Sequence, residues 1–196
     1  MHDPGIRLTR NELNLIQDTD FLVTKVIVLE KIKMLFSSIQ ELIKTKSNLV
    51  QEHPLNKNPG KISKGENYRQ LPYMVLDYPA HFNRSDIFAF RTMFWWGHHF
   101  SATLHLQGKF LEQFRSCILE NIDTLQKEGV YLGVGESPWE YHFEKKNYQL
   151  ISRSAAHQIE SGDFIKLSRR YDLNQFDLLP DEVLNYYLFL EKLIQQ

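Results

Sequence analysis

Residues 64–108 hold the side-chain types that could bind a small anion. Arginine and histidine bind carboxylate and phosphate groups, and ligand sites commonly set a few such polar groups against an aromatic wall. This stretch contains two of the three tryptophans and four of the eight histidines of the chain. The predicted ligand-binding residues are Tyr68, Arg69, Asp77, Arg91, Trp95, His99 and His105. We therefore expect a site for a small anionic ligand.

The alternation of polar and apolar residues from 98 to 107 is the main reason to group these side chains. In an extended strand, His99, Ser101, Thr103 and His105 all face one way, while Phe100, Ala102, Leu104 and Leu106 face the other. If the strands predicted at 73–78 and 86–96 are neighbours of this one, Asp77, Arg91 and Trp95 lie on the same polar side of the sheet. A basic loop at 64–69 could then close over this polar side. The alternative is a polar side that is merely solvated or packed against helices.

Other chemistries have weaker support. The adjacent His98 and His99 point to opposite sides of a strand, and His105 lies about 20 Å from His99 along it, so these histidines do not form a metal site. The chain has no HExxH motif and no paired CxxC motif, and we expect no metal and no cofactor. A site built across strands from Asp77, His81, His99 and His142 stays open. Cys117 is expected to be a small core residue, and no catalytic residue is assigned, so whether the chain is an enzyme stays undecided.

Charge and cysteine content narrow the partners and the compartment. The chain has 196 residues, with 23 Lys and Arg against 24 Asp and Glu, so its net charge of −1 does not favour nucleic acid or an anionic membrane. The N-terminal sequence lacks a signal-like apolar segment, and a single cysteine cannot form an internal disulfide, which together predict a reducing cytoplasm. Residues 92–108 carry no charge but contain three histidines, so we expect no transmembrane segment.

The periodicity of the chain predicts an α+β fold, with a mostly antiparallel sheet flanked by N-terminal, middle and C-terminal helices, in a single domain over 1–196. A long loop is expected at about 45–64. Further strands are expected at 130–134, 140–143, 148–152 and 163–169. The expected helices cover 10–17, about 20–46, 109–127, 154–159 and 180–194.

The helix predicted at 20–46 has more apolar surface than one core can cover. Seven of nine consecutive positions are apolar, namely Phe21, Leu22, Val23, Val26, Ile27, Val28 and Leu29. A helix that faces a single core needs only a stripe of about 100°. This excess predicts a homodimer, and the alternative function is therefore a non-catalytic interaction or structural protein.

The stretch KGENYRQLPYMVLDYPAHFNRSDIFAFRTMFWWGHHFSATLHLQG, residues 64–108, resembles uncharacterised bacterial protein families of unknown function. The resemblance covers roughly a quarter of the chain and implies no activity.

Overall fold

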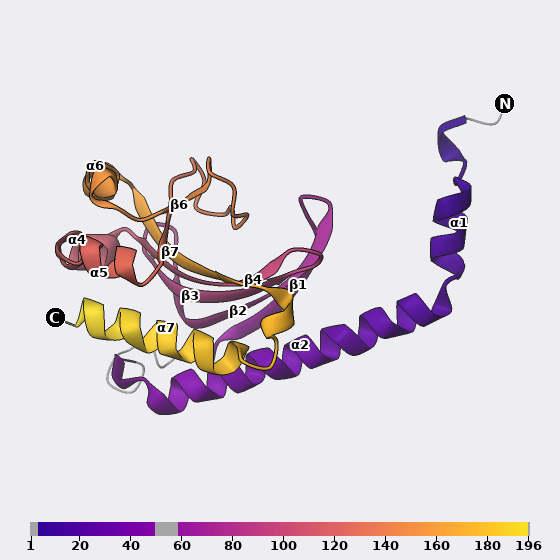
Figure 1. The fold of residues 1–196 in the computed structure, drawn as a ribbon, viewed down its shortest axis with the longest axis horizontal. Helices are drawn as coiled ribbons and strands as arrows, with labels where there is room; N and C mark the ends of the chain where they lie inside the picture. Colours follow the sequence, from indigo (N-terminus) through magenta and orange to yellow (C-terminus); the bar gives the residue numbers. More distant parts are fainter. Residues whose placement is uncertain (1–3, 50–58, 196) are drawn as a thin grey trace. The chain divides into compact units, whose positions relative to one another are not determined.

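The computed structural model of the protein describes residues 4–49 and 59–195, and it has the predicted α+β fold (Figure 1). Its contacts divide the chain into two compact units, Met1–Leu35 and Phe36–Gln196. The first unit contains helix α1, Arg10–Gln17, and helix α2, Thr19–Lys46, as far as Leu35. The second contains the sheet and the remaining helices.

Helix α1, Arg10–Gln17, begins where the sequence predicts it because Thr9 and Glu12 form a capping box. The Thr9 hydroxyl accepts a hydrogen bond from the Glu12 backbone N–H at 3.3 Å, and the Glu12 carboxylate accepts one from the Thr9 N–H at 2.6 Å. Helix α2, Thr19–Lys46, follows directly, and Asp18 caps it through the Phe21 N–H at 2.9 Å. The 3-10 turn η1, Pro4–Ile6, precedes both helices.

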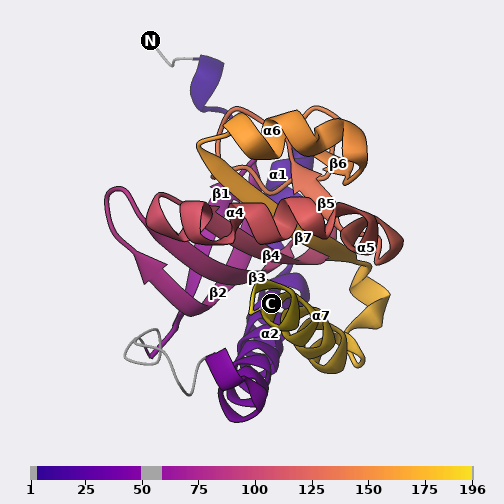
Figure 2. The same ribbon diagram turned by 90° about the vertical axis from the view of Figure 1, so that its left-hand side faces the viewer.

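Seven antiparallel strands form one sheet in the order β1-β2-β3-β4-β7-β5-β6 (Figure 2). The first four strands are consecutive hairpins, whereas β7 comes from late in the chain and lies between β4 and β5. Their bounds are Lys61–Tyr68, Leu71–Phe82, Ile87–Trp95, His99–Gln107, Phe164–Tyr171, Tyr131–Gly133 and Tyr148–Leu150, in the order of the sheet. The predicted strands at 86–96, 98–107, 130–134 and 163–169 are confirmed to within a few residues.

One face of the sheet is apolar and is covered by helices. Phe90 packs edge-on against Tyr187 of helix α7, Leu179–Ile194, with ring centroids 5.0 Å apart. Phe88 packs against Phe110 of helix α4, Lys109–Glu120, at 5.7 Å. Figures 1 and 2 show α7 running along this side of the strands. Since the helices occupy the apolar face, the polar residues of the same strands must lie on the opposite one.

The remaining helical elements are short, and in the chain they come after β4 and before α7. They are helix α5, Ile122–Lys127, the 3-10 turn η3, Arg153–Ala155, helix α6, Ala156–Ser161, and the 3-10 turn η4, Leu173–Gln175. The helix expected at 109–127 is thus two helices, α4 and α5. They are separated at Asn121, whose side chain donates to the Cys117 carbonyl at 3.0 Å instead of continuing a single helix.

Three further expectations are wrong. Residues 64–69 are not a loop, because β1 extends to Tyr68. Strand β2 is longer than the expected 73–78 and includes Pro72 and Pro79, because a bulge between Asp77 and Ala80 accommodates Pro79, which has no N–H to donate. Residues 140–143 form no strand. Of the loop expected at 45–64, residues 50–58 lie outside the described residues, and Lys46 and Lys61 belong to regular elements.

Candidate functional site

The pairing of four strands places polar residues side by side across the second face of the sheet. Asp77 of β2 pairs with Arg91 of β3, Arg91 with Thr103 of β4, and Thr103 with Ser168 of β7. Two residues further along β4, His105 pairs with Lys166 of β7. We call this set, Asp77, Arg91, Thr103, His105, Lys166 and Ser168, the polar face. Four of its six residues are at most 1% exposed and Asp77 is buried, so the alternative of a merely solvated face is excluded.

Asp77 and Arg91 form a bidentate ion pair. Arg91 Nε donates to Asp77 Oδ1 at 2.7 Å and Nη2 donates to Oδ2 at 2.8 Å. Their side chains are 11% and 16% exposed, respectively. Burial tends to lower the pKa of Arg91, but the bonds to Asp77 outweigh it and raise that pKa. The guanidinium charge expected to meet an anion is therefore already neutralised by a carboxylate within the protein.

Residues 134–147, which we call the cover segment, lie over the polar face with their aromatic rings. The Trp139 ring lies 5.5 Å from the His105 ring and 5.9 Å from the Arg91 guanidinium carbon. The Tyr141 ring lies 4.9 Å from the same carbon. The strand expected at 140–143 is absent, and the Tyr141 N–H donates to the Tyr68 hydroxyl and not to a neighbouring strand.

Lys166 is the charged residue that the sequence reasoning missed. Its side chain is fully buried, with Nζ 4.9 Å from the Tyr141 ring and 4.8 Å from the Tyr148 ring, and it donates a hydrogen bond to the Glu140 carbonyl oxygen. Burial lowers the pKa of Lys166 to about 7. A side chain at Gly133 would come within 2.8 Å of the lysine, so glycine is required there for this close approach.

The signal that could have identified Lys166 was present in the sequence. In 163–169, Phe164, Lys166 and Ser168 alternate with Ile165 and Leu167, which predicts a strand with one polar side. Only its position beside β4, which the local pattern does not encode, brings that side onto the polar face.

Several buried polar atoms around the polar face have no hydrogen-bond partner among the described residues. A folded protein pairs nearly all such atoms, so a local concentration of unpaired ones points to a place where another molecule can supply the bonds. The atoms are both ring nitrogens of His105, Nε2 of His99 and of His142, Oγ of Ser101, Oδ1 of Asn147 and the hydroxyl of Tyr148. The Tyr148 hydroxyl lies near the Thr103 and Ser168 hydroxyls, which bond to each other at 2.6 Å.

The two buried histidines of β4 are neutral at physiological pH. Burial, reinforced by the nearby charges of Lys166 and Arg91, lowers the pKa of His105 to about 3. Burial, together with Arg170 and His98, lowers the pKa of His99 to about 4. At pH 7 both rings can therefore donate one hydrogen bond and accept another, but they contribute no positive charge.

The tip of the β1–β2 hairpin ties the cover segment down. The Tyr68 hydroxyl accepts a hydrogen bond from the Tyr141 N–H at 2.7 Å and lies 2.9 Å from His142 Nδ1. Arg69 pairs with Glu144 at 2.5 Å on the surface. Tyr68 and Arg69 thus hold the cover segment in place and are not free to meet a ligand.

Six of the seven predicted residues lie on one side of the sheet, in two groups, and Arg69 lies in the turn between β1 and β2. Trp95 and His99 are paired across β3 and β4 beside Tyr68, with the Tyr68 and Trp95 rings 5.2 Å apart. Arg91 and His105 lie further along the strands. Because His99 and His105 are six residues apart on one strand, or about 20 Å, a small molecule cannot contact both.

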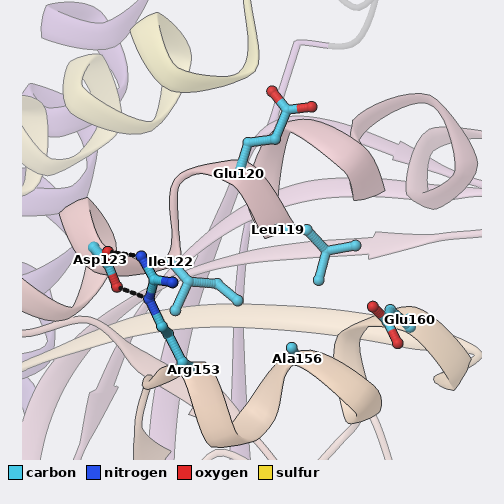
Figure 3. Close-up of a pocket in the computed structure, with 7 residues that line it drawn as sticks. All are labelled: Leu119, Glu120, Ile122, Asp123, Arg153, Ala156 and Glu160. Atoms are coloured by element: carbon cyan, nitrogen blue, oxygen red, sulfur yellow. Dashed lines mark hydrogen bonds and ion pairs between the residues drawn. The ribbon is translucent and has the colours of Figure 1, made fainter.

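Two surface clefts lie elsewhere, and none of the seven predicted residues lines either. The larger, about 490 Å³, is formed by α4, α5, η3 and α6, with Asp123 and Arg153 joined by an ion pair at its wall (Figure 3). Its lining residues are Leu119, Glu120, Ile122, Asp123, Arg153, Ala156 and Glu160. The other, about 280 Å³, is mostly apolar and lies between α4 and the end of α7.

Within residues 4–49 and 59–195, no group of three or more His, Cys, Asp or Glu side chains is arranged to hold a metal ion. None of the helices in this part of the chain has the length and apolarity needed to cross a bilayer. Cys117 is partly buried, and its thiol donates to the Leu193 carbonyl at 2.6 Å.

No protein-family model, curated protein or solved structure matches this chain.

Proposed function

We propose that this chain binds a small anionic molecule, a carboxylate or a phosphate, between the polar face and the cover segment. The observation that carries the proposal is Lys166, which is fully buried and has no carboxylate of a described residue within ion-pair distance, the nearest opposing charge being that of Glu140, which raises its pKa. A buried charge is costly unless it is paired, and an anion would supply the countercharge. With a pKa of about 7, Lys166 is protonated in roughly half of the molecules at neutral pH.

The neighbours of Lys166 offer hydrogen bonds of the kind that orient an anion. The Tyr148 hydroxyl and the neutral ring of His105 can each donate one hydrogen bond. The protons of the Thr103 and Ser168 hydroxyls are already used, because these two hydroxyls bond to each other and Ser168 donates to the Ala102 carbonyl. Arg91 is committed to Asp77, so it positions Tyr141 and the strands instead of binding the ligand. The charge that binds the anion is therefore assigned to Lys166 and not, as the sequence suggested, to Arg91.

Trp139 is the side chain whose displacement would admit a ligand. It is 49% exposed, yet its ring lies over both Arg91 and His105. A rotation of this ring opens the polar face to solvent without breaking the hydrogen bonds of Tyr68. Ligand binding should then change the fluorescence of Trp139, and a Trp139→Phe variant should lose that change.

Calorimetric titration of the whole chain at pH 7 with inorganic phosphate, acetate, succinate and citrate tests the proposal. We expect at least one of these anions to bind with a Kd below about 1 mM. Lys166→Met should abolish the binding, whereas the control Lys127→Met, which removes an exposed lysine outside the cover segment, should leave it unchanged. Methionine keeps the length of the lysine side chain and removes only its charge, so Lys166→Met should fold. A cooperative thermal unfolding transition of this variant checks that it does.

A second measurement locates the anion. The pKa of Lys166, followed by NMR of its Cε, should be near 7 in the free protein and should rise by about one unit or more when the anion is bound. The proposal is wrong if none of the four anions binds, or if an anion binds equally well to Lys166→Met.

A further inference from the structure

Lys166 carries a nucleophilic amine whose reactivity anion binding alone does not use. An amine nitrogen bonds to carbon only when it is unprotonated, and lysines desolvated by burial are the ones that form imines with carbonyl compounds. Lys166 Nζ lies 4.9 Å from the Tyr141 ring and 4.8 Å from the Tyr148 ring, and it donates one hydrogen bond, to the Glu140 carbonyl oxygen. These contacts fix the position of the nitrogen and provide no countercharge that would keep it protonated.

The charges around Lys166 leave much of its amine neutral. Burial lowers the pKa of Lys166, Glu140 of the cover segment raises it, and Arg91 of β3 lowers it, with a resulting value of about 7. Asp77 is bonded to Arg91, and the ring of His105 on β4 is neutral. About half of the Lys166 amine is therefore unprotonated at pH 7, against fewer than about one in a thousand for an ordinary exposed lysine.

The carbonyl compound that fits this site best carries its own carboxylate. A protonated imine keeps a positive charge on the nitrogen, and a buried cation needs a countercharge. In a 2-oxo acid the carboxylate is bonded to the carbonyl carbon, so the negative charge stays beside the nitrogen after the new bond has formed. The Tyr148 hydroxyl and the His105 ring, both without a partner among the described residues, can donate hydrogen bonds to the oxygens of such an acid. A neutral ketone would leave the iminium charge unpaired.

The packing around Lys166 favours a short acid. Behind the lysine there is no spare room, because even a methyl group at Gly133 would come within 2.8 Å of Lys166 Cε. In front, the half-exposed Trp139 ring lies 5.5 Å from the ring of His105, which pairs with Lys166 across β4 and β7. Rotation of Trp139 frees the space of one indole ring, which is larger than pyruvate.

We infer that Lys166 forms an imine with a short 2-oxo acid held between the polar face and the cover segment, an inference that rests on the proposed anion site. The neutral Nζ attacks the carbonyl carbon, the C–N bond forms as the C=O double bond opens, and a proton passes from the nitrogen to the oxygen. This oxygen takes a second proton and leaves as water, while the nitrogen lone pair completes the C=N bond. Counted from the ammonium form, two protons leave in the water and one stays on the iminium nitrogen, so no oxidant or reductant is needed.

Reductive trapping of the whole chain tests the inference. The protein is incubated at pH 7 with pyruvate and sodium cyanoborohydride, and peptide mass spectrometry then identifies each lysine that formed an imine, because the reduced adduct adds the mass of pyruvic acid less one oxygen atom. We expect Lys166 to be labelled at least about tenfold faster than the exposed Lys127 of α5. In urea, where the chain is unfolded, the two lysines should be labelled at equal rates, because burial is the source of the difference.

Two small molecules separate anion binding from imine formation. Lactate has the carbon skeleton of pyruvate without the ketone, so we expect it to bind in calorimetry, to slow the labelling of Lys166 and to form no adduct. Acetone has the ketone without the carboxylate, so its preference for Lys166 over Lys127 should be at least about tenfold smaller than that of pyruvate. Lys166→Met should lose the fast-labelled site, and its cooperative thermal unfolding checks that it is folded.

The outcomes distinguish this inference from the proposed function. If anions bind but pyruvate labels Lys166 no faster than Lys127, the imine is overturned and the anion site stands. If pyruvate and acetone show the same preference for Lys166, or if Lys166 is labelled fast while no anion binds, the assignment of a 2-oxo acid is overturned, because the carboxylate is not recognised. If Lys166→Met keeps a fast-labelled site, another lysine is the nucleophile and the inference is wrong.

Discussion

Breaking the Asp77–Arg91 pair should destabilise the fold strongly, whereas replacing both partners should not. Arg91→Met leaves the Asp77 carboxylate at 8% exposure without its bidentate partner, and Asp77→Val leaves the guanidinium unpaired between the Tyr141 and Trp139 rings. Removing one member of a buried pair costs about 3–5 kcal/mol. For a chain of 196 residues this lowers the thermal midpoint by roughly 10 °C.

The double variant Asp77→Val/Arg91→Met should recover most of that loss. It buries two apolar side chains of suitable shape on neighbouring strands and leaves no charge unpaired, and such replacements are often close to neutral. Urea unfolding followed by circular dichroism at pH 7 measures all four proteins. The coupling energy of the cycle is expected to be about 3 kcal/mol or more.

The chain contains a matched control for this cycle. Asp123 and Arg153 form a bidentate pair of the same type at the surface, with Nε–Oδ1 at 2.8 Å, but their side chains are 49% and 82% exposed. The cycle Asp123→Val/Arg153→Met should show almost no coupling, because solvent screens both charges. If the two cycles give equal coupling energies, burial is not what makes the Asp77–Arg91 pair strong, and the assignment of Arg91 to a structural role is refuted.

Two further predictions concern pH and the β1–β2 turn. His99 and His105 have folded-state pKa values of about 4 and 3, whereas the unfolded chain takes up these protons near 6.5, so the free energy of unfolding should fall as the pH decreases from about 6.5 to 3. Urea unfolding of His105→Gln should show a shallower fall than the wild-type protein, and identical slopes would contradict the burial of this ring. Arg69 and Gln70 have φ values of 51° and 70°, a backbone region that favours glycine, so Gln70→Gly should raise the free energy of unfolding by about 0.5–1 kcal/mol. If urea unfolding shows that Gln70→Gly lowers the free energy of unfolding, the backbone of this turn is not strained.

Local sequence patterns determined the elements whose signals are complete within a few residues. The capping box of Thr9 and Glu12 predicts the start of α1 because both hydrogen-bonding groups lie within one helical turn. The alternation of 98–107 predicts β4 and which residues share its polar side. The two-sided apolar pattern of α2 likewise predicts a surplus of exposed apolar surface.

Only the tertiary structure decided what each polar residue meets. Asp77 neutralises Arg91 because β2 and β3 pair in a register that places them opposite each other, and no local pattern specifies that register. Lys166 reaches the polar face because β7, some sixty residues after β4, pairs with it. The cover segment has no periodicity to read, since its conformation is set by Tyr141 and Trp139 packing on a surface that exists only once the strands have assembled. Short-range propensities act within an element, whereas the contacts of the candidate site join residues far apart in the chain, and packing alone selects them.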